Sequence, residues 1–298
     1  MTDQDWLAER FERERPHLRG VAYRMLGSLS EADDAVQEAW IRLSRTDTSA
    51  VENLRGWLTT VVARVCLNQL RSRRTRRETP LEPFVADPIV TPQSGGDPEH
   101  EALLGDSIGL ALLAVLETLT PAERVAFVLH DVFAVPFDEV AAIVGRTPAA
   151  TRQLASRGRR RVQGAPVPDA DLDGQWAVVD AFLAASRDGD FERLLAVLDP
   201  DVVLRSDGGM ARPRLDSIIR GPRAVASNAM LFRRLAASAR RALVNGVPGG
   251  VVPSPAPDGA PFAVLAFTVR GGMIVEIDVL ADPERLARLD LDLDVLAG

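Results

Sequence analysis

Apolar residues recur at helical spacing through the first 77 residues of the chain. Ser30 to Asp33 has the character of a capping box, which predicts a helix from there to about Ser44. Polar residues 45–53 then predict a loop. A long helix follows over residues 55–77, and its apolar stripe comprises Trp57, Leu58, Val61, Val62, Val65 and Leu70. Because this stripe must be buried, we expect Trp57, and Trp40 before it, to lie in a helical core.

A second helical stretch runs from about Glu101 to Val162, with Thr120-Pro121 marking one helix start. Its last part, Pro136–Val162, has the pattern of two helices joined at Gly145, a residue that permits a tight turn. In the second of these helices Thr147 is the expected N-cap. The residues at helical spacing that are expected to pack inward are Thr151, Ala155, Gly158 and Val162. This pattern predicts a helix-turn-helix.

The remainder of the chain has a mixed pattern. Residues 79–100 and 165–174 are rich in proline and polar residues and are expected to be linkers without regular structure. Between 175 and 298, helices are expected over 175–186, 190–198 and 221–239, and strands over 202–204, 242–247, 250–253, 261–270 and 273–281. Gly271-Gly272 predicts a two-residue hairpin turn. Helices followed by strands in this order indicate an α+β domain with a curved antiparallel sheet.

Charge is segregated along the helical part of the chain. The net charge is −7, yet acids gather at residues 31–38 while arginines gather at 55–77 and 146–161. This segregation suggests two different partners for two faces. Seven arginines lie between Arg55 and Arg77, where no acid occurs, which suits contact with phosphates.

The second helix of the helix-turn-helix is expected to carry an exposed arginine-rich face. The outward residues of this face are Arg152, Gln153, Ser156, Arg157, Arg159 and Arg160. Guanidinium groups suit phosphates and guanine edges, and Gln and Ser suit base edges, so such a helix fits the major groove of DNA. The alternative is a solvated basic helix in a bundle.

Cofactor chemistry is not indicated. The single cysteine, Cys66, lies in an apolar helix stripe, which excludes disulfide frameworks and cysteine metal sites and predicts a buried thiol. No nucleotide-binding glycine loop or metal-ligand spacing occurs, so no cofactor and no metal site is expected. The absence of a signal peptide and of a long apolar run predicts a soluble, cytoplasmic protein with no membrane partner.

These segments resemble the parts of a known family. Residues 10–77 resemble region 2 of the extracytoplasmic-function bacterial sigma factors, through GSLSEADDAVQEAWIRL (27–43) and LRGWLTTVVARVCLNQLRSRR (54–74). Residues 107–162 resemble region 4, through LETLTPAERVAFVLHDVFAVPFDEVAAIVGRTPAATRQLASRGRRRV. Residues 175–289 resemble a SnoaL-like cone of the cystatin/NTF2-like class, through FLAASRDGDFERLLAVLDPDVVLRSDGG. The combination is that of the SigJ-type sigma factors.

The resemblance implies a domain plan of region 2 (1–78), a linker (79–100), region 4 (101–164), a second linker (165–174) and a SnoaL-like regulatory domain (175–298). It implies a sigma factor that directs the RNA polymerase core to specific promoters. The expected polymerase contacts are the β′ clamp helices and the β flap.

The resemblance also assigns residues to these partners. The polymerase-binding face would comprise Asp33, Asp34, Gln37 and Glu38, and Ala32, Ala35, Val36 and Ala39 would face inward. The loop and helix after Asp47 would read the −10 element and trap a flipped base. Candidates for strand or phosphate contacts on the following helix are Asn68, Arg71, Arg73 and Arg74. Region 4 would read the −35 element with Arg152, Gln153, Ser156 and Arg157.

Enzymatic activity of the C-terminal domain is disfavoured. All histidines and the only tyrosine lie before residue 165, which leaves Asp207, Glu276 and Asp278 as candidate acids. A solvated or lightly buried strand face is the structural interpretation of the last two. We therefore expect no catalytic residue and no enzyme.

Two further motifs indicate a regulatory role instead. Asp207-Gly208-Gly209 resembles the family's Asp-Gly-Gly motif, and Asp282-Pro283-Glu284-Arg285-Leu286 resembles its Asn-Pro-Asp-Lys-Leu motif. The regulatory candidates are Asp207, Gly208, Gly209, Asp282, Pro283 and Leu286. Leu81-Glu82-Pro83 matches the family's proline-bearing linker motif only in part. Whether an unidentified small ligand fills the cone is left open by the sequence.

Two other hypotheses compete with a sigma factor under regulation in cis. One is a stand-alone, ligand-sensing helix-turn-helix regulator, and the other is a SnoaL-type enzyme with a helical extension. The acidic face at 31–38 and the basic helix at 55–77 favour the sigma factor, because an operator-binding regulator needs neither.

Overall fold

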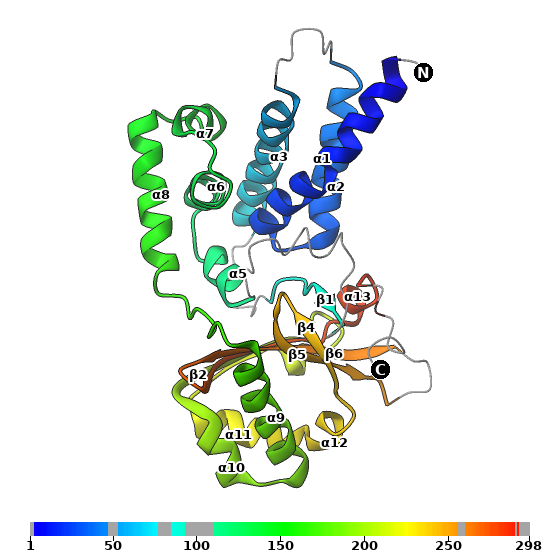
Figure 1. Ribbon diagram of the computed structural model, residues 1–298, viewed down its shortest axis with the longest axis vertical. Helices are drawn as coiled ribbons and strands as arrows, with labels where there is room; N and C mark the ends of the chain where they lie inside the picture. The colour runs from blue at the N-terminus through cyan, green and yellow to red at the C-terminus, as the bar shows by residue number, and fades with distance from the viewer. Residues whose placement is uncertain are drawn as a thin grey trace. The chain divides into compact units, whose positions relative to one another are not determined.

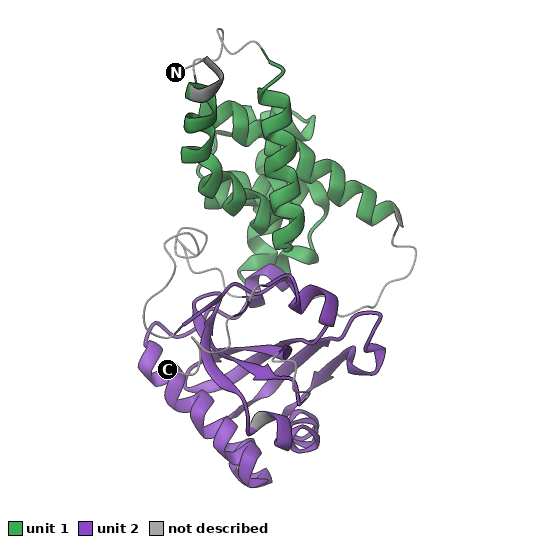
Figure 2. Ribbon diagram, turned by 90° about the vertical axis from the view of Figure 1, so that its right-hand side faces the viewer, with its two compact units in different colours: residues 1–80, 101–105, 115–164 green, residues 81–100, 106–114, 165–298 purple. Residues whose placement is uncertain are grey.

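The computed structural model describes residues 3–46, 53–76, 85–92, 110–255, 260–289 and 291. The chain forms two compact units, which Figure 2 shows in different colours. Unit 1 comprises residues 1–80, 101–105 and 115–164, and unit 2 comprises 81–100, 106–114 and 165–298.

Unit 1 begins with the helices α1 (Asp3–Leu26), α2 (Leu29–Leu43) and α3 (Leu54–Arg76), which pack against one another in pairs. The inward face expected for α2 is confirmed, since Ala32, Ala35, Val36 and Ala39 are buried. The helix begins earlier than the capping-box pattern predicted. Ser28 is the N-cap, and its hydroxyl accepts a hydrogen bond from the Glu31 amide at 3.4 Å.

The rest of unit 1 contains α6 (Pro121–Phe127), a π-helical turn (Val128–Val132), α7 (Phe137–Val144) and α8 (Pro148–Val162). The helix start at Thr120-Pro121 is confirmed as a capping box with Glu123. The helix-turn-helix is also confirmed: Gly145 ends α7 at φ 71°, and Thr147 caps α8. Thr151, Ala155 and Gly158 are buried as predicted, while Val162 is half-buried.

The two helical parts of unit 1 pack on each other. α3 contacts α6 and α7, and α1 contacts the π-helical turn. His17 on α1 lies edge-on to Phe133 with ring centroids 5.3 Å apart, and its Nε2 lies 3.4 Å from the Thr59 hydroxyl. The guanidinium of Arg24 stands 5.2 Å above the Phe133 ring. Segments about a hundred residues apart in the sequence are thus packed together, and Phe133 is one of the side chains at their contact.

Unit 2 is a curved mixed sheet with helices over one face (Figure 1). The helices that cover this face are α9 (Leu172–Asp188), α10 (Phe191–Val197), α11 (Pro222–Leu231) and α12 (Arg233–Ala236). A short helix, α13 (Pro283–Leu286), follows the last strand; of α5 (Leu110–Glu117), residues 110–114 belong to unit 2 and residues 115–117 to unit 1. The core between helices and sheet includes Trp176, Phe182, Phe267 and Ile277.

The described strands are β1 (Val90–Thr91), β2 (Leu198–Asp207), β3 (Ser217–Arg220), β4 (Arg240–Val244), β5 (Val247–Pro253), β6 (Pro261–Arg270) and β7 (Met273–Leu280). They lie in the order β1-β4-β5-β6-β7-β2-β3. The predicted hairpin at Gly271-Gly272 is confirmed, with both residues at positive φ. The α+β class is confirmed as well.

Three features of the sheet differ from the sequence-based expectation. The pairing of β2 with β7 is parallel, so the sheet is not wholly antiparallel. β3 was not predicted, and its four residues are too few to show a clear alternation. The linker was expected to lack regular structure, yet Val90 and Thr91 form β1 and pair with β4. Pro88 precedes that pairing, so its missing N–H costs no ladder hydrogen bond.

Candidate functional site

The acidic face of α2 is exposed as its sequence pattern requires. Asp33, Asp34 and Gln37 are exposed and Glu38 is half-buried. Arg19 of α1 pairs with Asp33 at 2.7 Å, and Arg42 pairs with Glu38 at 2.9 Å. Asp34 therefore presents the most available carboxylate of this face to a partner.

The four candidates on α3 divide into two kinds. Asn68, Arg71 and Arg74 are exposed and are free to contact phosphates. Arg73 instead pairs with Glu31 and donates a hydrogen bond from Nη1 to the Leu26 carbonyl at 3.0 Å. Its guanidinium thus ties α3 to the ends of α1 and α2. The loop after Asp47 that was expected to read the −10 element lies outside the described residues.

The predicted DNA-contacting residues of α8 lie around the middle of the helix. Arg152, Gln153, Ser156 and Arg157 are exposed, and the Arg152 guanidinium stands 5.5 Å above the Phe137 ring of α7. The last turn is engaged within unit 1. There Arg159 donates to Asp131 at 2.8 Å, and Arg161 pairs with Glu123 at 2.9 Å. The four predicted base- or phosphate-contacting residues thus lie together on one helix face.

The buried thiol of Cys66 behaves as predicted for a small apolar side chain. It is fully buried in the α3 stripe, and burial raises its pKa to about 12. Trp57 and Trp40 are half-buried, and the Trp40 ring packs against Phe11 with centroids 5.0 Å apart.

In unit 2, Arg285 holds the linker against the sheet. Its Nε donates to Asp87 at 2.7 Å, its Nη1 donates to Asp207 at 2.8 Å, and its Nη2 donates to the Val85 carbonyl at 2.6 Å. Asp282 caps α13 by accepting from the Arg285 amide at 3.5 Å, which orients this helix. We call Arg285, Asp87, Asp207 and the Val85 backbone the linker clamp. It is largely buried, and burial raises the pKa of Asp207 although Arg285 opposes the rise.

The two glycines after Asp207 are required by close approaches at the clamp. A Cβ on Gly208 would lie 2.3 Å from the Arg212 carbonyl oxygen, and one on Gly209 would lie 2.3 Å from the Asp282 carboxylate. Gly209 also has a φ of 61°. Asp207, Gly208, Gly209 and Asp282 therefore lie at or next to the clamp. Pro283 is the first residue of α13, and Leu286 is buried on the same helix.

Sequence reasoning missed two members of the clamp. Arg285 lies inside the second motif but was not selected as a site residue. Asp87 is an acid enclosed by apolar residues in the stretch Val85 to Ile89, and that enclosure was the available signal for a buried, paired carboxylate. Asn245 was missed too: its side-chain oxygen accepts from the Ile89 amide at 2.9 Å. Leu81-Glu82-Pro83 lies outside the described residues.

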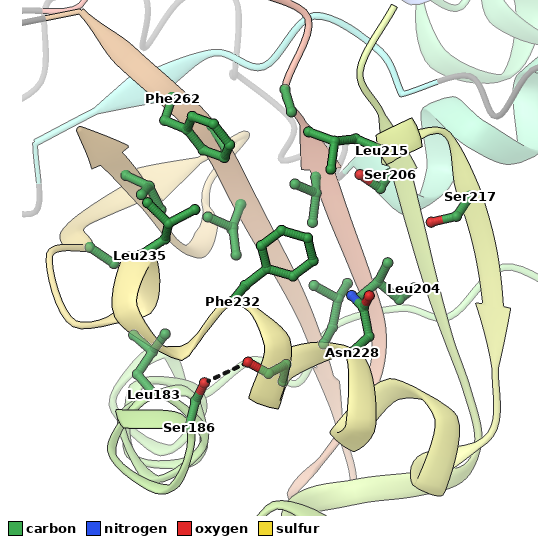
Figure 3. Close-up of a pocket in the computed structure, with 18 of the residues that line it drawn as sticks. Leu183, Ser186, Leu204, Ser206, Leu215, Ser217, Asn228, Phe232, Leu235 and Phe262 are labelled. Carbon is green, nitrogen blue, oxygen red and sulfur yellow. Dashed lines mark hydrogen bonds between the residues drawn. The ribbon is translucent and has the colours of Figure 1, made fainter. Parts of the chain in front are cut away.

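The acids considered for catalysis point away from the interior of the cone. A cavity of about 130 Å³ lies on the helix-covered face of the sheet, lined on β2 and β7 by Leu204, Ser206, Ile277 and Val279 (Figure 3). Asp207, Glu276 and Asp278 alternate with these residues and are not among those that line it.

Glu276 and Asp278 are not on a solvated strand face. Arg205 donates to Asp278 at 2.7 Å and to Glu276 at 2.7 Å, and Asp278 is only 3% exposed. Burial raises the pKa of Glu276. The three charges neutralise one another in part and so belong to the structure of the sheet.

Comparison with known proteins identifies both helical parts. Residues 10–76 match the family model "Sigma-70 region 2", and residues 109–162 match "Sigma-70, region 4". The pairing of these two regions on one chain defines a sigma factor of RNA polymerase.

The whole chain has relatives of the same plan. It is 39% identical to the ECF RNA polymerase sigma factor SigJ of Mycobacterium tuberculosis, over 92% of this chain and 91% of that protein. It is 34% identical to a protein of the same species named "Probable ECF RNA polymerase sigma factor SigI", over 98% and 99%. The crystal structure of SigJ is similar with a TM-score of 0.77 at 36% identity, covering 96% of this chain and all of that one.

The chain belongs to the extracytoplasmic-function sigma factors, which direct the RNA polymerase core to specific promoters. The SigJ likeness extends over the C-terminal α+β domain. No helix in the described part of the chain is both long enough and apolar enough to cross a membrane.

Proposed function

We propose that α2 docks this sigma factor on the β′ clamp helices of RNA polymerase through Asp33, Asp34, Gln37 and Glu38. The exposed carboxylate of Asp34 supports this assignment, because a basic partner surface can reach it without breaking an ion pair inside unit 1. Region 4 would contact the β flap. These partners act in the cytoplasm, where we expect the protein to work.

Promoter DNA would be contacted by two separate surfaces. Near the −10 element, the DNA strand would be contacted by Asn68, Arg71 and Arg74 of α3. Arg73 stabilises the fold through Glu31 and Leu26, and it could contact DNA only if its ion pair with Glu31 broke. Arg152, Gln153, Ser156 and Arg157 of α8 suit the −35 element in the major groove.

The C-terminal domain would act on these surfaces in cis. The observation that carries this proposal is the docking of residues 85–91 on unit 2, through β1 and the linker clamp. These residues lie between region 2 and region 4. Each docked residue shortens the maximum span of the linker between the two regions by up to about 3.5 Å. Docking therefore limits how far the regions can separate, and separation is what binding to an extended promoter demands.

Packing within unit 1 supports the same proposal. Regions 2 and 4 share a compact unit in which Phe133 contacts His17 and Arg24. A bias of a few kcal/mol from the linker would shift the balance between this closed arrangement and a separated one.

We propose no catalytic role for the C-terminal domain and no cofactor. The orientation of its candidate acids away from the cavity supports this assignment, as does the pairing of Glu276 and Asp278 with Arg205.

The test is transcription of a pooled promoter library by purified RNA polymerase core with the full chain, the Asp34→Arg variant and the Glu192→Arg variant. Glu192 is exposed on α10, so its substitution makes the same charge change away from the acidic face. We expect Asp34→Arg to abolish selective initiation and polymerase binding, while Glu192→Arg leaves both intact. Equal polymerase binding by the two variants would overturn the docking assignment. DNA binding without initiation by the full chain would indicate a stand-alone regulator.

A further inference from the structure

The cavity of unit 2 has the composition of a ligand site. Its volume is about 130 Å³ and its walls are predominantly aliphatic and aromatic, with Phe182, Phe232 and Phe262 among them (Figure 3). An apolar cavity of roughly 150 Å³ holds a molecule of the size of benzene. The space therefore suits one aromatic ring or a short alkyl chain.

Three polar side chains face this apolar space from one side. Ser206 on β2 and Ser217 on β3 are register partners, and Asn228 comes from α11 (Figure 3). Ser206 is only 9% exposed, and among the described residues neither its hydroxyl nor the side chains of Ser217 and Asn228 have a hydrogen-bond partner. Ser217 and Asn228 are half-buried, so these side chains can offer hydrogen bonds to a polar group of a ligand in the cavity.

The charge of the cavity limits the head group of its ligand. Arg214 is the single charged residue among those that line it, and Arg214 is exposed at the rim. Neutral hydroxyl and amide groups do not stabilise a buried ion as a paired charge would. A neutral molecule with one hydroxyl, carbonyl or amide group fits this lining better than a carboxylate.

The wall of the cavity is continuous with the linker clamp. Ser206 faces the cavity, while the next residue, Asp207, holds Arg285. After Asp207 the chain turns back to Leu215, which lines the cavity, and Arg212 bonds the carbonyls of Phe262 and Ala281, both lining residues, at 2.9 Å. A ligand in contact with these residues is thus one residue away from the clamp.

The geometry points to a binding site for a small neutral aromatic or short-alkyl compound with one hydrogen-bonding group, whose occupancy stabilises the docked linker. The direction proposed rests on adjacency: Ser206 lines the cavity and the next residue, Asp207, holds Arg285, so a ligand that binds more tightly while the linker is docked stabilises docking. The same linkage requires that loss of the clamp weakens ligand binding by an equal factor. The regulatory half of this inference rests on the proposed control in cis.

The binding half is tested on the full chain by calorimetric titration with phenol, benzene and benzoate. We expect saturable binding of phenol, weaker binding of benzene and none of benzoate. Ser206→Ala should weaken phenol binding about tenfold and leave benzene unchanged, since one neutral hydrogen bond is worth about 1.4 kcal/mol at most. Ser227→Ala is the matched control, because Ser227 is an exposed serine on α11 and is not among the residues that line the cavity.

A second variant keeps the test independent of the hydroxyl. Ala263→Leu adds three carbon atoms to a lining residue and should abolish binding of both phenol and benzene. Failure of phenol and benzene to bind the unaltered chain, or benzoate binding more tightly than phenol, would overturn the ligand class.

Coupling is measured by hydrogen–deuterium exchange of residues 85–91 with and without phenol. We expect slower exchange with phenol, and several-fold weaker phenol binding by Arg285→Ala. If phenol binds but hydrogen–deuterium exchange of residues 85–91 is unchanged, the coupling to the linker is wrong, although the ligand site itself is retained. If clamp variants alter transcription while no probe binds, control in cis stands and the ligand site fails.

Discussion

Both units of this protein hold together segments that lie far apart in the sequence, but they do so with different chemistry. In unit 1 one such contact is made by Phe133, an aromatic ring in contact with an imidazole and a guanidinium. In unit 2 the contact centres on Arg285, a guanidinium shared by two carboxylates and a backbone carbonyl. The contact in unit 1 also includes the packing of α3 on α6 and α7. The contact in unit 2 combines one guanidinium shared by two largely buried carboxylates with the pairing of β1 and β4.

The largest effect is expected from breaking the linker clamp. Arg285→Ala removes the guanidinium that forms ion pairs with the largely buried Asp87 and Asp207, at a cost of about 3 kcal/mol in the free energy of unfolding of unit 2. Chemical denaturation followed by hydrogen exchange in the sheet measures this loss, and residues 85–91 should exchange much faster. Arg288→Ala removes an exposed arginine three residues later and should change neither quantity. Equal stability of the two variants would show that the clamp is not energetically important.

A smaller effect is expected from the aromatic contact. Phe133→Ala removes an edge contact and a cation–π contact, together about 1–2 kcal/mol. Distances between spin labels on cysteines placed at Gln37 and Arg160, both exposed, should lengthen and broaden. The native thiol of Cys66 is buried with a pKa near 12 and does not compete for the label. Phe137→Ala, whose ring stacks on His130 within region 4, should leave these distances unchanged.

Acidification should weaken unit 1 through His17. Burial and the charges of Arg55 and Arg24 lower the pKa of His17 below 6.5, against the opposing charge of Glu14. The folded state therefore disfavours the protonated ring, and its contribution to stability is complete above pH 6.5 and falls as the pH drops toward the lowered pKa. Denaturation curves at pH 7.5 and 5.5 should show a smaller difference for His17→Gln than for the unaltered chain. An identical pH dependence would contradict the assignment.

The smallest effects are expected from substituting single arginines of α3, and they distinguish an arginine that stabilises the fold from one that is exposed and proposed to contact DNA. Arg71→Ala should reduce the salt slope of promoter binding by about 1 and leave stability unchanged. Arg73→Ala should lower stability by about 1 kcal/mol, because it loses Glu31 and the Leu26 carbonyl. Filter binding over a salt series together with thermal unfolding distinguishes them. The reverse pattern would exchange the two roles.

Much of the helical part of the fold follows from local sequence. Gly145, Thr147 and the capping box at Thr120 are determined by neighbours within a few residues, so pattern and propensity predict them well. The strand β1 could not be predicted in this way. Its two residues become a strand only because β4, some 150 residues later, offers an unpaired edge.

The clamp was predicted only in part for a similar reason. The Asp-Gly-Gly motif shows a local constraint, since a side chain at Gly208 or Gly209 would collide with nearby atoms. The local sequence around Asp87, the other carboxylate of the clamp, gives no signal except its apolar neighbours. The ion pair between Asp87 and Arg285 is a property of tertiary structure, so local sequence does not predict it. The role of Arg73 was obscured likewise: its contacts with Glu31 and Leu26 come from other helices.

The small strand β1 has a consequence for how long a released molecule survives. It covers β4, whose N–H and C=O groups would otherwise form the open border of the sheet. Open borders recruit strands from other chains, and the resulting assemblies are removed slowly. A sigma factor whose linker is released would thus have a limited lifetime, because the linker either docks again or the molecule is lost to self-association. Transcription by the released form would then arrive as a short pulse rather than a sustained state.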